Sequence, residues 1–260
     1  MKKAIRALAL IVSFLLVVTI RVYPNTSAEK YKFEVMETTI DQVHAGYKSG
    51  QLTAHALVQL YLDRILAYEQ NGPMINSIIT LNPKALNDAD QLDAQFRKSG
   101  FVGPLHGIPI LVKDEIDVVG MPTTLGSIVF KDFRPTEDAF VIERLKKAGA
   151  IILGKTSLGE FASGDAFGSM FGITRNPYDL ERTPGGSSGG SGAALSANFS
   201  TVAVGEETSG SLRRPGGWND VVAMRPTGGI FLEYRLAYRR GLPISSATRK
   251  IEESPSEIFR

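Results

Sequence analysis

The chain has 260 residues, of which 43% are hydrophobic, with 29 Lys and Arg against 27 Asp and Glu. This length and composition are enough to bury a large core, as one large domain or two small ones. The net charge of +2 comes without a basic stripe interleaved with aromatic residues, so we expect no nucleic-acid partner. The absence of cysteine excludes disulfides, cysteine nucleophiles and thiolate metal sites, and three histidines leave little for a metal cluster.

The first 28 residues have the pattern of a secretory signal peptide. Three basic residues precede the apolar run "ALALIVSFLLVVTI", which ends at Arg21 and is shorter than the ~20 residues of a membrane-spanning helix. Thr26 and Ala28 are small residues placed as they are before a signal-peptidase cut after Ala28. We therefore predict a signal peptide at 1–28 and a secreted or extracytoplasmic protein. An uncleaved membrane anchor is the alternative.

Helical signals dominate the segment that follows. Thr39 and Gln42 form a T-x-x-Q capping box, which predicts a short helix that ends at Gly50. A second helix is expected from Thr53 to about residue 72, and a third from the Asn82–Pro83 pair to about residue 100.

Short apolar runs then alternate with helical segments. The strand-like runs are "GIPILVKD" (107–114), "IILGK" (151–155) and "TVAVG" (201–205). Helices are expected in "DAFVIERLKKAGA" (138–150), "TSLGEFASG" (156–164) and "AALSAN" (193–198). This alternation predicts an α/β fold with a covered sheet. The pattern is lost in the arginine- and lysine-rich text after Arg225.

Two glycine- and serine-rich stretches, 185–192 and 205–211, raise the question of chemistry. A flexible linker is one interpretation, but the first stretch runs directly into a helix, whose N-terminus offers backbone N–H groups to negative charge. A phosphate-binding loop needs a lysine directly after the glycines, and none is present. A hydroxyl site remains.

A serine nucleophile needs a base, and the choice lies between His106 and Lys113. His106 is better interpreted as a packing or hydrogen-bonding residue. Lys113 ends an apolar strand, where burial can lower a lysine pKa from its ordinary ~10.4 by up to ~3–5 units. Asp114, Glu115 and Asp117 would oppose that shift if they faced the amine. A solvent-exposed lysine stays the alternative at such a position.

Five motifs taken together resemble the amidase signature family. They are "GPLHGIPILVKDEIDVVGMPTTLGS", "AGAIILGKTSLGEFA", "TPGGSSGGSGAALSAN", "VGEETSGSLRRP" and "RPTGG", and the resemblance covers Thr39 to Gly229. The segment "NGPMINSIITLNPKALNDADQLD" is most similar to peptide amidases and related secreted members.

The resemblance implies a Ser–cisSer–Lys triad with Lys113 as base, Ser187 as the bridging serine after a cis peptide bond, and Ser211 as nucleophile. It also implies an oxyanion hole made by the backbone N–H groups of Thr208, Ser209, Gly210 and Ser211. The family needs no metal or cofactor, and the implied substrate is a peptide amide or small acyl amide. Arg213 and Arg214 are expected to form structural pairs.

The resemblance further implies a mixed sheet covered by helices, here incomplete on its C-terminal side. We expect residues 29–229 to be the N-terminal portion of an amidase signature domain and 230–260 to be an atypical tail. The family usually has Asp-Thr-Gly-Gly-Ser at the nucleophile, whereas this chain has Glu207-Thr208-Ser209-Gly210-Ser211. An inactive truncated amidase is therefore one alternative. The other is a protein like the A component of an amidotransferase, which releases ammonia for transamidation on aminoacyl-tRNA.

Overall fold

The computed structural model describes residues 33–226 and 246–250. The predicted signal peptide at 1–28 and most of the predicted tail lie outside these residues. Among the described residues, no helix has both the length and the apolar character needed to cross a membrane.

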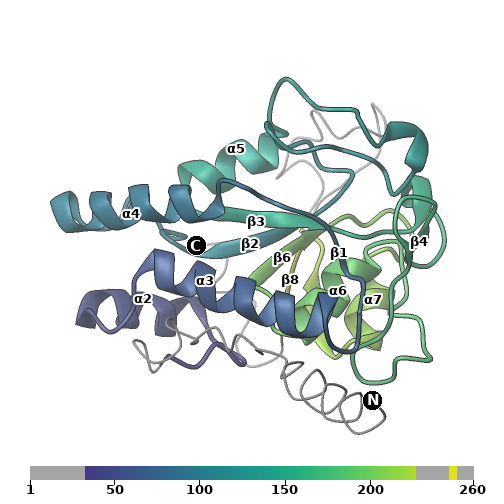
Figure 1. Cartoon of the computed structure of the whole chain (residues 1–260), viewed down its shortest axis with the longest axis horizontal. Coiled ribbons are helices and arrows are strands. Elements are labelled where there is room, and N and C mark those ends of the chain that lie inside the picture. The colour runs from purple at the N-terminus through teal and green to yellow at the C-terminus, as the bar shows by residue number, and fades with distance from the viewer. Residues whose placement is uncertain (1–32, 227–245, 251–260) are drawn as a thin grey trace, which may run out of the picture.

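A six-stranded mixed sheet forms the centre of the fold, with the strand order β1-β3-β2-β6-β8-β7 (Figure 1). Its strands are β1 (Ile78–Leu81), β2 (Pro109–Lys113), β3 (Ile151–Thr156), β6 (Val202–Gly205), β7 (Val221–Met224) and β8 (Ser246–Lys250). The central strands β3, β2 and β6 are parallel neighbours, and the outer pairings are antiparallel. A separate two-stranded hairpin joins β4 (Phe167–Gly168) to β5 (Gly172–Ile173).

Helices cover the central strands. They are α2 (Ile40–Ser49), α3 (Ala54–Ile65), α4 (Ala85–Ser99), α5 (Phe140–Lys147), α6 (Gly189–Ser196) and α7 (Arg213–Trp218). In the view of Figure 1, α5 lies above the central strands and α2 and α3 lie below them. Strands β2, β3 and β6 are buried along their whole length, which explains why they appear in the sequence as continuous apolar runs. The prediction of a mixed α/β sheet covered by helices is confirmed.

The caps follow the sequence signals closely at the first two helices. Thr39 Oγ1 accepts from the Gln42 N–H at 3.1 Å and Gln42 Oε1 accepts from the Thr39 N–H at 2.8 Å, as the capping box predicts. Gly50 closes α2 in the left-handed conformation, with φ +72°. Thr53 caps α3, whose last turn continues as a single π-helical turn over Leu66–Gln70.

The third helix starts later than predicted. Asn82 is not its N-cap, because α4 begins at Ala85. The Asn82 N–H donates to the Leu153 carbonyl and its side-chain amide donates to the Ile152 carbonyl, so Asn82 is tied to β3. Its Oδ1 accepts from the Lys84 N–H, which makes a turn before the helix. The helix expected in 156–164 is similarly reduced to one 3-10 turn, Glu160–Ala162.

The segment after residue 229 adds one strand to the main sheet. Strand β8 lies between β6 and β7, antiparallel to both, with Ala203 opposite Thr248 and Gly205 opposite Ser246. The predicted boundary at 229 and the atypical tail at 230–260 stay predictions, because most of these residues lie outside the described ones.

Candidate active site

Three segments meet at the carboxyl ends of parallel strands. Lys113 is the last residue of β2, and the loop 206–212 follows β6 directly. Because β2 and β6 are parallel neighbours, with Val112 opposite Val204, their ends lie at one edge of the sheet. The turn that carries Ser187 leads into α6, which packs on the same strands.

A continuous chain of polar contacts links the three predicted residues. Lys113 Nζ donates to Ser187 Oγ at 2.7 Å, and Ser187 Oγ donates to Ser211 Oγ at 2.9 Å. Lys113 is 0% exposed and Ser187 2%, whereas Ser211 is partly exposed. The arrangement has a buried amine at one end and a hydroxyl accessible from solvent at the other.

The turn that carries Ser187 requires glycine at neighbouring positions. The Gly186–Ser187 peptide bond is cis, as the family resemblance implies. A Cβ on Gly186 would overlap the Gly164 carbonyl oxygen, and one on Gly190 would overlap the hydroxyl and carbonyl oxygen of Ser157. Glycine at these two positions therefore lets the turn and the start of α6 lie against neighbouring backbone.

The Glu207 carboxylate shapes the loop that carries Ser211. It accepts hydrogen bonds from the backbone N–H groups of Gly210, Leu212 and Arg213, with N–O distances of 2.7 Å for Leu212 and 3.1 Å for Arg213. Gly210, which we expected among the oxyanion donors, thus has its N–H engaged inside the protein. The hydrogen bonds lower the pKa of Glu207 although burial acts in the opposite direction as the largest single influence.

The remaining candidate donors are exposed or partly exposed. Within residues 33–226 and 246–250, no acceptor is bonded to the backbone N–H of Thr208, Ser209 or Ser211. Thr208 and Ser209 are exposed, and Ser211 is partly exposed. These three N–H groups can therefore face a developing oxyanion without first breaking an internal hydrogen bond.

Two buried carboxylates lie beside the Lys113 amine: Glu115, which the sequence placed among the acidic residues that could face it, and Glu206, which was not predicted. Glu206 Oε2 accepts a hydrogen bond from Nζ at 2.9 Å. Glu115 Oε1 lies 3.1 Å from Nζ as an ion pair, although the angle does not make it a hydrogen bond. Burial raises the pKa of Glu115; Lys113 lowers it and Glu206 raises it further. Glu206 follows an apolar strand next to that of Lys113, which is the signal that could have pointed to it.

A second buried lysine lies beside this cluster. Lys155 Nζ, on β3, donates to the Pro122 carbonyl at 3.1 Å and to Thr123 Oγ1 at 3.2 Å, and it lies 3.6 Å from Asp114 Oδ1. Burial lowers the pKa of Lys155, and Asp114 opposes this. Of the three acidic residues after β2, Glu115 faces Lys113 while Asp114 pairs with Lys155.

Comparison with known proteins identifies the family. The amidase family model matches residues 56–249. The chain belongs to the amidase family. The solved structure of peptide amidase from Stenotrophomonas maltophilia is 42% identical with a TM-score of 0.70, and the match covers 72% of this chain and 40% of that one.

Other amidase-family relatives are equally informative. An amidase family protein from Bacillus anthracis is 30% identical with a TM-score of 0.80, over 89% of this chain and 47% of that one. The A component of glutamyl-tRNA(Gln) amidotransferase from Alkaliphilus metalliredigens is 41% identical over 78% of this chain and 41% of the relative. The chain thus spans less than half the length of these amidase relatives.

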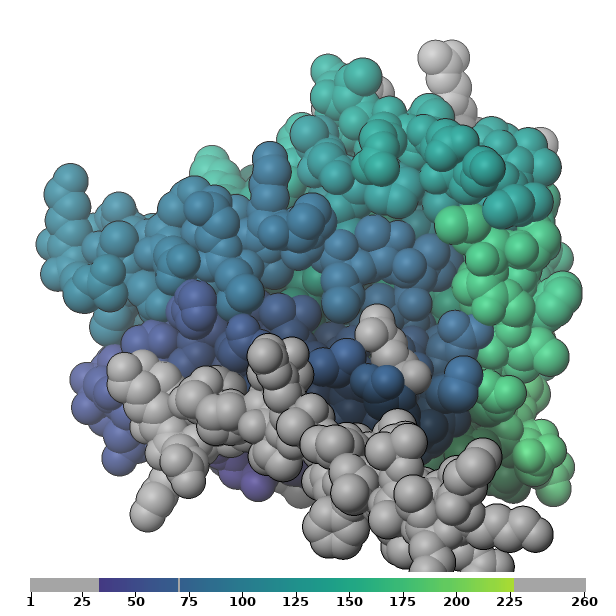
Figure 2. All heavy atoms as spheres, viewed as in Figure 1, coloured from purple at the N-terminus to yellow at the C-terminus, as the bar shows by residue number. Residues whose placement is uncertain are grey.

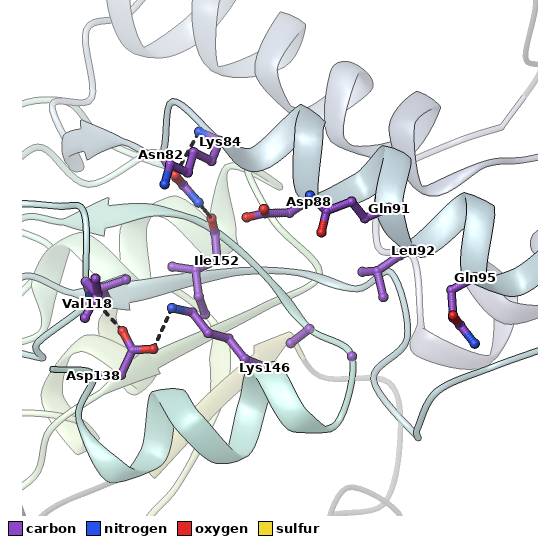
Figure 3. Close-up of a pocket in the computed structure, with 13 residues that line it drawn as sticks. Asn82, Lys84, Asp88, Gln91, Leu92, Gln95, Val118, Asp138, Lys146 and Ile152 are labelled. Atoms are coloured by element: carbon purple, nitrogen blue, oxygen red, sulfur yellow. Dashed lines mark hydrogen bonds and ion pairs between the residues drawn. The ribbon is translucent and has the colours of Figure 1, made fainter.

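A pocket of about 690 Å³ lies between α4 and α5 (Figure 3). Its wall includes Asp88 and Gln91 of α4 and the Lys146–Asp138 ion pair, 2.6 Å long. None of Lys113, Ser187 and Ser211 lines it. In the described part of the chain, no cluster of three or more His, Asp or Glu side chains could hold a metal ion.

The remaining predicted residues have structural contacts. His106 is buried among Phe96, Phe101 and Tyr47, and its Nδ1 accepts from the Val102 N–H at 3.2 Å. Arg213 lies 3.5 Å from Glu207, and Arg214 pairs with Asp165 while its guanidinium lies 5.2 Å from the centre of the Trp218 ring. The expected structural pairing of the two arginines is confirmed.

Proposed function

We propose that the chain hydrolyses carboxamide C–N bonds with Ser211 as nucleophile, Ser187 as proton relay and Lys113 as base. The observation that carries the proposal is the unbroken Lys113 Nζ–Ser187 Oγ–Ser211 Oγ contact, with its accessible end at Ser211. Membership of the amidase family supports the same reaction class.

In the proposed reaction Ser211 Oγ attacks the amide carbonyl carbon. Its proton passes to Ser187, whose own proton passes to a neutral Lys113 amine. The oxyanion faces the backbone N–H groups of Thr208, Ser209 and Ser211, each such donor typically being worth ~3–4 kcal/mol. The C–N bond then breaks, and the leaving amine takes the proton back through Ser187.

Water completes the cycle. It attacks the acyl-Ser211 ester, its proton follows the same relay, and the carboxylic acid is released as Ser211 regains its hydrogen. Substrates are proposed to be peptide or small acyl amides, because solved peptide amidase structures are among the similar proteins. The protein is proposed to act outside the cytoplasm after removal of residues 1–28. N-terminal sequencing of the exported protein should then start at Glu29, and an intact Met1 would contradict this.

A second candidate function is glutamine amide hydrolysis that supplies ammonia to a transamidation partner. The observation in its favour is the 41–43% identity to the A components of two curated glutamyl-tRNA(Gln) amidotransferases. Ammonia release from free glutamine, compared with release from a peptide C-terminal amide, separates the two functions. A preference for the peptide amide favours the first.

The direct test is labelling of the full chain by a fluorophosphonate probe, which forms a bond from serine Oγ to phosphorus with loss of fluoride. We expect labelling of wild type and of the remote control Ser99→Ala, and at least a ~10³-fold loss for Ser211→Ala, since the attacking atom is removed. Folded wild-type protein without labelling would refute the proposal and favour an inactive amidase. Equal labelling of Ser211→Ala would refute Ser211 as the nucleophile.

A further inference from the structure

Glu206 connects the proposed base to the loop that carries the nucleophile. Its Oε2 accepts from Lys113 Nζ at 2.9 Å, and its Oε1 accepts from the Thr208 hydroxyl. Its backbone N–H donates to Ser188 Oγ at 3.1 Å, and its carbonyl accepts from the same hydroxyl at 3.0 Å. Glu206 therefore contacts the proposed base Lys113, the loop that carries Ser211 and the turn that carries Ser187.

The charges around Lys113 are unbalanced. The carboxylates of Glu115 and Glu206 both lie within 3.1 Å of Nζ, from the ends of β2 and β6. The next charged groups are Asp114, Asp117 and the β3 residue Lys155. The four carboxyl groups and the two lysine amines of this cluster belong to side chains that are at most 8% exposed. Four acidic groups therefore lie beside only two amines in a region shielded from water.

The proposed reaction needs a lone pair on Lys113 Nζ that accepts the proton of Ser187 Oγ. Nζ lies 2.7 Å from Ser187 Oγ, and Ser187 Oγ lies 2.9 Å from Ser211 Oγ, so each proton transfer spans one hydrogen bond. The Glu206 carboxylate, 2.9 Å from Nζ, lies close enough to orient the amine toward Ser187.

We propose that Glu206 is a positioning residue that holds the Lys113 amine against Ser187 Oγ. The inference rests on the proposed function, since it concerns the same base. The hydrogen bond to Glu206 fixes the orientation of the Lys113 amine, so that another of its bonding directions points to Ser187 Oγ.

The pH dependence of the labelling rate tests the charge. We expect the pH at which the fluorophosphonate labelling rate rises to be lower in Glu206→Gln than in wild type, because the substitution removes an opposite charge from beside Nζ. Asp138→Asn removes a carboxylate from another lysine pair, Lys146–Asp138, and should leave the profile unchanged. An unshifted rise in Glu206→Gln would overturn the proposal.

A titration that needs no activity separates this proposal from the proposed function. In protein labelled with [15N]lysine, the Lys113 side-chain signal is identified by its absence from Lys113→Met. It should titrate at lower pH in Glu206→Gln than in wild type. If wild type is not labelled at any pH, the proposed function fails, while the NMR titration still decides the role of Glu206.

Glu206→Asp separates charge from orientation and serves if Glu206→Gln does not fold. It keeps the negative charge but shortens the side chain by one methylene, so the contact with Nζ is lost. We expect a ~10-fold or greater fall in the maximal labelling rate, with a smaller shift of the profile than in Glu206→Gln. A maximal rate equal to that of wild type would refute the positioning role.

Discussion

At the scale of one residue, Glu69 shows how burial changes the pKa of a carboxyl group outside the candidate site. It is 8% exposed, its Oε1 accepts from the Ile78 N–H at 2.6 Å, and its Oε2 accepts from Ser77 Oγ at 3.2 Å. Burial raises the pKa of Glu69, and these hydrogen bonds only partly offset that rise. The ionised carboxylate therefore costs stability in the folded state.

The prediction concerns Glu69→Gln, which keeps the shape and an acceptor for Ile78. A carboxyl whose pKa is raised on folding lowers stability as pH rises from its ordinary value of about 4.5 towards the folded value. The free energy of unfolding of wild type should thus fall relative to Glu69→Gln between pH 4 and pH 7, as measured by urea unfolding. A difference between the two proteins that does not change with pH would contradict the prediction.

Lys113 and Glu206 show what the sequence could predict about the site. The motifs located Lys113, Ser187 and Ser211, and the structure brings these three side chains together. Glu206 and the engagement of the Gly210 N–H were not predicted, since both depend on how the 206–212 loop folds back on itself. Such contacts follow from loop conformation, which residue types and spacing do not determine.

At the scale of elements, buried strands and capped helices were the most predictable. The runs that became β2, β3 and β6 are buried on both faces, so apolar character alone revealed them. The hairpin β4–β5 and strands β1 and β7 were not predicted, because each has only two to four residues and includes partly or fully exposed positions. The prediction that Asn82 caps the third helix was wrong for a different reason. Its hydrogen bonds to β3 override its local preference for an N-cap position.

The start of helix α6 gives a prediction at this scale. Gly190 lies where a Cβ would overlap the Ser157 hydroxyl and carbonyl oxygen at the end of β3. Gly190→Ala should push α6 and the Ser187 turn away from the sheet, costing ~1–3 kcal/mol of stability and reducing fluorophosphonate labelling. Thermal unfolding and the labelling rate measure the two effects.

Gly217 provides the matched control in helix α7. A Cβ at this exposed position meets nothing within 4 Å, and its φ is not positive. Gly217→Ala should therefore be neutral or stabilise the protein by up to ~1 kcal/mol, because alanine loses less backbone entropy on folding. Equal destabilisation by both substitutions would show that the Ser157 contact is not the cause.

On the scale of the whole molecule, an apolar surface lies beside the site. In Figure 2, teal and green segments from the middle of the chain adjoin along the right-hand edge. The exposed side chains of this apolar surface are Ile128, Val129, Phe130, Phe133, Phe161, Phe167 and Ile173. The Phe130 and Phe161 rings lie 6.0 Å apart, and the Ile128 N–H donates to Ser169 Oγ of the hairpin, so the segments form one surface. The Gly159 N–H donates to the Ser187 carbonyl, which places this surface close to the Ser187 turn.

Exposed apolar surfaces of this kind promote association between molecules. Val129 is 77% exposed, so Val129→Lys should leave folding within ~0.5 kcal/mol of wild type while placing a charge on the apolar surface. Sedimentation velocity over a range of concentrations should show self-association of wild type that Val129→Lys reduces. Val119→Lys, at a 48% exposed position beside the pocket between α4 and α5, is the matched control. If the two lysine variants associate equally, generic charge repulsion explains the change and the apolar surface has no special part in it.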